Sequence, residues 1–119
     1  MNQEKQIYIL LKKTGILSSI KDKDYARFTV GYGLMDLSVD KLTENIIALS
    51  HYYIVNGDLV PDPDMQIEID FKNKTARALS FQNAYIYQEA YNDKIQKELN
   101  DFLIYWLSNI KAFNYRLQD

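Results

Sequence analysis

The 119-residue chain contains no cysteine and only one histidine, His51. Without a thiol it can form no disulfide, iron–sulfur ligand set or thiolate nucleophile. A single imidazole also excludes metal sites that need two histidines, and no cysteine is present for a zinc site. No apolar run approaches the roughly 18 residues that a membrane-spanning helix needs, and the first 13 residues lack the charge order of a signal peptide. We expect a cytoplasmic protein that does not associate with membranes and has no cofactor.

The composition is that of a folded globular protein, with 47% apolar and 25% charged residues. The length suits a single domain spanning residues 1–119. The formal net charge is −2, which opposes the phosphate attraction that nucleic-acid binders use. We therefore expect a protein partner rather than a nucleic acid, while the oligomeric state stays open. Basic pairs such as Lys12 and Lys13 or Lys21 and Lys23 are interpreted as solvated edges.

Helical periodicity marks both ends of the chain. Ile7, Leu10 and Leu11 predict an N-terminal amphipathic helix that ends at Gly15, and the polar residues 16–25 are interpreted as a surface connection. Near the C-terminus the apolar positions share one broad helical face; they are Ile95, Leu99, Phe102, Leu103, Trp106, Ile110 and Phe113. We expect Asp93 to cap this long helix, with Trp106 near the middle of its contact with a sheet.

Strand periodicity occupies the middle of the chain. Apolar and polar residues alternate over residues 35–40 and, most clearly, over 65–72. A return strand is predicted over 76–82, continuing through Tyr85 and Tyr87 after a bend. Residues 45–55 fit a helix as well as a strand; we favour a strand preceded by a hairpin turn at residues 43–45. The predicted fold class is α+β, an antiparallel meander of about four strands with the N- and C-terminal helices on one face.

Turn-forming residues are concentrated between positions 56 and 65. Asn56-Gly57-Asp58 favours left-handed turn angles, and Pro61 and Pro63 lack backbone donors, so we expect them to stop a strand ladder. The resulting prediction is a rigid, exposed and acidic loop running from Asn56 to Met65.

Two sequence motifs in this half of the chain resemble a bacterial family of unknown function. The first, HYY-x-x-NGDL-x-x-DP-x-M, runs from His51 to Met65, and the second, ELN-x-FL-x-x-WL, runs from Glu98 to Leu107. The resemblance covers roughly residues 35–115 and leaves out the N-terminal helix. It implies that the chain is often encoded on mobile genetic elements, and it implies no activity and no catalytic residue.

The acidic loop supports two chemical interpretations. Asp58, Asp62 and Asp64 are oxygen ligands of the kind that Mg²⁺, Mn²⁺ or Ca²⁺ prefers. With His51 as a general base they predict a metal-dependent phosphodiester hydrolase. The structural interpretation, which we favour, is that Asn56 and Gly57 shape the turn and that Asp58 and Asp62 bond nearby backbone amides.

We therefore expect a non-enzymatic protein-interaction domain that uses the loop, with the hydrolase as the alternative. The candidate binding residues are His51, Tyr53, Asn56, Asp58, Asp62 and Asp64. The ten tyrosines leave a third hypothesis, a single-strand nucleic-acid binder with stacking platforms. The alternative interpretation places Tyr8, Tyr85, Tyr87 and Tyr105 at the core boundary with their hydroxyls turned outward.

Overall fold

A computed structural model describes residues 2–31 and 35–118. The elements in chain order are α1 (Gln3–Lys13), α2 (Ile16–Ser19), β1 (Tyr25–Thr29), β2 (Leu37–Lys41), β3 (Ile46–Val55), β4 (Asp58–Asp70), β5 (Thr75–Gln82), β6 (Tyr87–Glu89), α3 (Asp93–Ala112) and β7 (Arg116–Leu117). None of the helices in these two ranges has both the length and the hydropathy needed to cross a bilayer.

The strands form one antiparallel sheet in the order β6-β5-β4-β3-β2-β1-β7. Sequence neighbours pair from β1 to β6, and β7 closes the far edge against β1. The α+β class and the antiparallel arrangement are confirmed, as is the strand assignment for residues 45–55. The expected number of about four strands is wrong, because the sheet also contains the short strands β1, β6 and β7.

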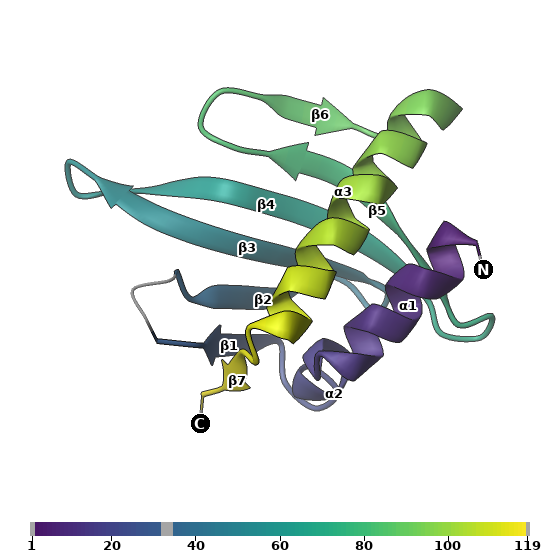
Figure 1. The fold of residues 1–119 in the computed structure, drawn as a ribbon, viewed down its shortest axis with the longest axis horizontal. Coiled ribbons are helices and arrows are strands. Elements are labelled where there is room, and N and C mark those ends of the chain that lie inside the picture. The colour runs from purple at the N-terminus through teal and green to yellow at the C-terminus, as the bar shows by residue number, and fades with distance from the viewer. Residues whose placement is uncertain (1, 32–34, 119) are drawn as a thin grey trace.

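Both long helices lie across the same face of the sheet (Figure 1). α1 packs against α3, and both helices contact β5. The buried apolar residues of the two helices meet those of the strands in one cluster. Trp106 is 6% exposed within it, which fits its expected place in the helix–sheet contact.

Two local predictions fail at the helix ends. Residues 16–20 are not part of a surface connection, since Gly15 turns the chain at φ +85° and α2 then buries Ile16 and Ile20 in the core. The predicted surface connection is confined to residues 21–24, which are exposed between α2 and β1. The cap of α3 is Asn92 rather than Asp93, because the Asn92 side chain accepts a hydrogen bond from the Ile95 amide at 2.8 Å.

The return strand also ends earlier than expected. β5 stops at Gln82, and the backbone amide of Asn83 bonds the carbonyl of Ile86, so β6 runs back beside β5 instead of extending it. The Asn83 side chain accepts bonds from the amides of Tyr85 and Ile86, a local turn that competes with strand continuation.

Candidate functional site

The middle of the sheet extends into a two-stranded ribbon, here defined as residues 52–61. β2 pairs with β3 only as far as His51, and β5 pairs with β4 only as far as Asp64. Beyond these points β3 and β4 continue to pair with each other as far as Val55 and Asp58. The ribbon therefore projects past both neighbouring strands, as Figure 1 shows.

The tip of the ribbon is a two-residue turn. Asn56 and Gly57 have φ values of 52° and 85°, and two consecutive positive φ angles match the right-handed twist of the flanking strands. The left-handed turn angles predicted for this pair are confirmed. Asn56 and Asp58 are therefore placed at the outermost point of the hairpin, and both are exposed.

The two prolines do not form a loop, contrary to the prediction. β4 runs through both of them from Asp58 to Asp70. Between the pairs Ser50↔Asp64 and Tyr52↔Pro61, β3 has one residue, His51, and β4 has two, Asp62 and Pro63. This bulge takes Pro63 out of the regular ladder, and Pro61 lies where β4 has a free edge. Both are positions at which a strand tolerates a missing donor.

His51 points into the core, toward the helical layer. Its Nδ1 lies 3.0 Å from the Asp36 carbonyl oxygen, and its ring centroid lies 5.4 Å from that of Trp106 and 5.8 Å from that of Tyr115. The side chain is 8% exposed. Burial lowers the pKa of His51, against the opposing effects of the Asp36 carbonyl and of the Asp62 and Asp36 charges.

Asp64 lies on the other face of the sheet. The Tyr52 hydroxyl donates a hydrogen bond to Asp64 Oδ2 at 3.0 Å, and strand alternation places both on the side opposite to His51. Burial raises the pKa of Asp64, and the Tyr52 bond opposes that rise. The pKa of neighbouring Asp40 is raised by burial and by the Asp64 charge.

The expected site residues are thus divided among separate places. His51 faces the helices, Asp64 faces the opposite side, and Asp58 lies at the ribbon tip. In the described ranges 2–31 and 35–118, no group of three or more histidine and acidic side chains is arranged to hold a metal ion. His51 and the aspartates do not converge on one point, so no observation favours the hydrolase alternative.

A family model of a domain of unknown function, DUF6908, matches residues 5–115. The chain belongs to the DUF6908 family. The match begins within α1, so the family includes the N-terminal helix that the sequence motifs left out. No curated protein and no solved structure matches the chain.

The ribbon of this DUF6908 domain carries exposed apolar side chains that were not among the predicted binding residues. Leu59 is 67% exposed and Val55 is 44% exposed, on the two sides of the Asn56-Gly57 turn. In the sequence, an apolar residue stands on each side of the two-residue turn. A strand end that faces the core has the same pattern, so the pattern alone does not identify these side chains as exposed.

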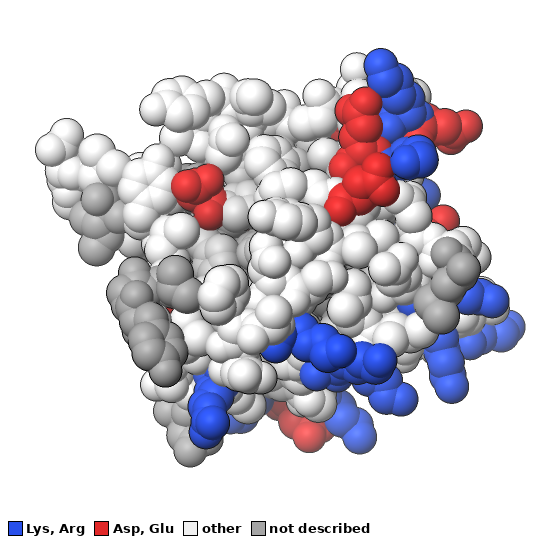
Figure 2. All heavy atoms as spheres, viewed as in Figure 1, with Lys and Arg blue, Asp and Glu red and all other residues white. Residues whose placement is uncertain are grey.

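Charge is distributed unevenly over the DUF6908 domain. Residues 42–71, which include the ribbon, contain six acidic residues and no lysine or arginine. Since the whole chain has a net charge of −2, the remaining residues carry +4. On the face drawn in Figure 2, lysine and arginine side chains lie mainly along the lower edge, which carries α1 and α2, and others lie beside acidic side chains at the start of α3; none lies over the projecting ribbon.

Three of the four tyrosines do not follow their predicted placement at the core boundary. Tyr85, Tyr87 and Tyr105 are 92%, 57% and 65% exposed, so the rings as well as the hydroxyls reach the surface. Tyr85 lies in the β5–β6 turn and Tyr105 lies on the outer side of α3. Tyr8 is half-buried and packs against the core, as predicted.

Proposed function

We propose that this DUF6908 domain binds a protein partner through the ribbon and takes no part in catalysis. The observation that carries the proposal is the extension of the ribbon past both neighbouring strands. In the part of the chain that the structure describes, no strand pairs with the outer edges of residues 52–55 and 58–61. Free strand edges offer backbone donors and acceptors to another chain.

The β3 edge is the better docking edge of the two. Pro61 removes a backbone donor from β4, and Pro63 removes another beside it. Residues 52–55 of β3 contain no proline and lie beyond the end of β2. A partner strand added there would continue the line of β2 and could cover Val55.

The composition of the ribbon also supports binding. Exposed strand edges are often protected from other chains by lysine or by proline, and residues 52–55 contain neither. The ribbon also exposes one apolar side chain on each face, since Val55 pairs with Asp58 and Leu59 pairs with the adjacent residue of β3. Exposed apolar side chains are common in protein interfaces, and the carboxylates of Asp58 and Asp62 suit a partner with a basic surface.

The direct experiment is a double substitution in that rim. We expect Asp58→Ala with Asp62→Ala to leave the fold intact, because both side chains are exposed. The partner captured by the wild-type domain should bind about two- to thirtyfold more weakly, as for the loss of two surface charge pairs. The affinity between the purified domain and its purified partner is measured at low and at physiological salt, because salt screens the attraction between the acidic side chains and a basic partner surface.

The matched control is Asp22→Ala with Asp24→Ala, which removes the same charge from exposed positions before β1. This control should bind as the wild type does. If both double variants keep wild-type affinity, or if both lose it equally, the ribbon is not the recognition surface.

A further inference from the structure

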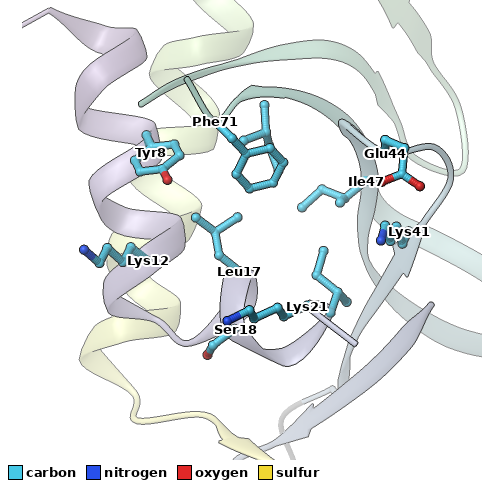
Figure 3. A pocket seen from close by; sticks show the side chains of 11 residues that line it. Tyr8, Lys12, Leu17, Ser18, Lys21, Lys41, Glu44, Ile47 and Phe71 are labelled. Carbon is cyan, nitrogen blue, oxygen red and sulfur yellow. The ribbon is translucent and has the colours of Figure 1, made fainter. Parts of the chain in front are cut away.

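A cavity of about 580 Å³ lies at the opposite end of the β3–β4 hairpin from the ribbon. It is bounded by α1, α2, the β2–β3 turn and the ends of β3 and β4 that carry Ile47 and Ile69 (Figure 3). Its size is within the range of small-molecule sites. Nothing in the proposed role of the ribbon uses it.

The interior of the cavity is apolar. Leu17, Ile20, Ile47 and Ile69 supply aliphatic surface. The Tyr8 and Phe71 rings meet edge to face, with centroids 6.5 Å apart. Figure 3 shows the Tyr8 hydroxyl directed toward the open space, and within the described residues that hydroxyl makes no hydrogen bond. An apolar hollow with a few polar groups at defined points is the usual form of a ligand site.

The rim of the cavity is basic. Lys12 lies on α1, Lys21 in the α2–β1 connection and Lys41 on β2, and Glu44 is the one acidic residue in the lining. The ion pairs formed among residues 2–31 and 35–118 are Arg27–Asp36, Arg77–Glu68 and Lys97–Asp101. The three rim ammonium groups therefore have no carboxylate partner in the described chain, and they give the rim a net charge of +2.

We propose that this cavity binds a small molecule in which an apolar chain carries one carboxylate. The apolar chain would cover the aliphatic and aromatic lining, which gains free energy as water leaves. The carboxylate would lie at the rim beside a lysine ammonium group, where opposite charge within a few ångströms stabilises it. The hollow is open to solvent on one side, and its volume suits a compact ligand better than an extended peptide strand.

Octanoate is the probe, with 1-octanol and octyltrimethylammonium as ligands of equal chain length. Binding is followed by methyl NMR on the intact chain. We expect saturable shifts at Leu17, Ile20, Ile47 and Ile69, with octanoate binding about two- to fivefold more tightly than either of the other two. Equal affinity for all three ligands, or shifts scattered over other methyl groups, would overturn the proposal.

A second experiment tests whether the lysines at the rim contribute to octanoate binding. Lys12→Gln with Lys21→Gln and Lys41→Gln should weaken octanoate binding about two- to fivefold. The control triple variant Lys13→Gln, Lys94→Gln and Lys111→Gln has the same net charge, lies outside the cavity lining, and should bind normally. Unchanged binding in the rim variant would contradict the assignment. Sedimentation that shows a dimeric wild type and a monomeric rim variant would also contradict the assignment, because a second copy of the chain would then occupy the cavity.

Discussion

His51 is the residue whose surroundings say most about the chemistry of the site. Its ring is enclosed by Trp106 and Tyr115, and one nitrogen is held by the Asp36 carbonyl. The carbonyl accepts a hydrogen bond, so the proton of the neutral ring lies on Nδ1. Such a histidine links the sheet to α3.

The lowered pKa of His51 makes a specific prediction for stability. The unfolded chain binds a proton at His51 near pH 6.5 and the folded chain binds it only at lower pH. Over that window the unfolded state holds more protons, so the free energy of unfolding falls as the pH is lowered. We expect denaturant unfolding to show a steeper loss of stability from pH 7.5 to 5.5 in the wild type than in His51→Gln.

The comparison with His51→Gln is necessary because carboxylates titrate in part of the same range. Burial raises the pKa of Asp40 and Asp64, which acts on stability with the opposite sign. Both carboxylates are present in the wild type and in His51→Gln, so their contributions to the pH dependence of stability cancel when the two proteins are compared. Identical pH slopes in the two proteins would show that the imidazole is not held neutral.

At the scale of elements, α3 and β5 are joined by a buried polar connection. The Ala78 amide donates to Asn100 Oδ1 at 3.0 Å, and Gln96 Nε2 donates to the Ala78 carbonyl at 2.7 Å. The β4–β5 register shifts beside this point, between Gln66 and Ile67. α3 thereby supplies hydrogen-bond partners to the backbone N–H and C=O groups of Ala78, at a point where the strand ladder is irregular.

Loss of this connection should be costly. Asn100→Leu removes the acceptor of the Ala78 amide, and both residues are at most 3% exposed. We expect it to lower the free energy of unfolding by about 1–3 kcal/mol, the penalty for a buried unsatisfied donor. Chemical denaturation measures it against Asn109→Leu, the same change on another face of α3, where the side chain makes no hydrogen bond to any other described residue. Equal stability of the two variants would refute this role.

The elements that could be predicted from sequence are those with a long, regular pattern. α3 shows helical spacing over five turns, and the second half of β4 alternates without interruption from Met65. β1, β6 and β7 have five residues or fewer and were missed, because so few positions establish no period.

The site was less predictable because a bulge depends on the partner strand. Ser50 and Tyr52 are two residues apart in β3, whereas their partners Asp64 and Pro61 are three residues apart in β4. That extra residue shifts the alternation, so spacing along the sequence cannot tell which aspartate shares a face with His51. The turn at Asn56-Gly57 was predictable, since its chemistry is local.

At the scale of the whole molecule, the two proposed surfaces lie at opposite ends of one hairpin. The ribbon end is acidic and projects beyond the sheet, and the cavity end is basic and hollow. The single helical layer covers the sheet between them (Figure 1). A ligand and a protein partner could therefore occupy the two ends together, without competing for the same residues.

The most direct measurement of the central claim is site-specific photo-cross-linking in cells that contain the partner. A benzophenone side chain is placed at Leu59 in the ribbon or at Tyr105 on α3, positions that are 67% and 65% exposed. We expect one dominant adduct from position 59, reduced by Asp58→Ala with Asp62→Ala, and no such adduct from position 105. The same adducts from both positions, or an adduct from position 105 alone, would contradict it.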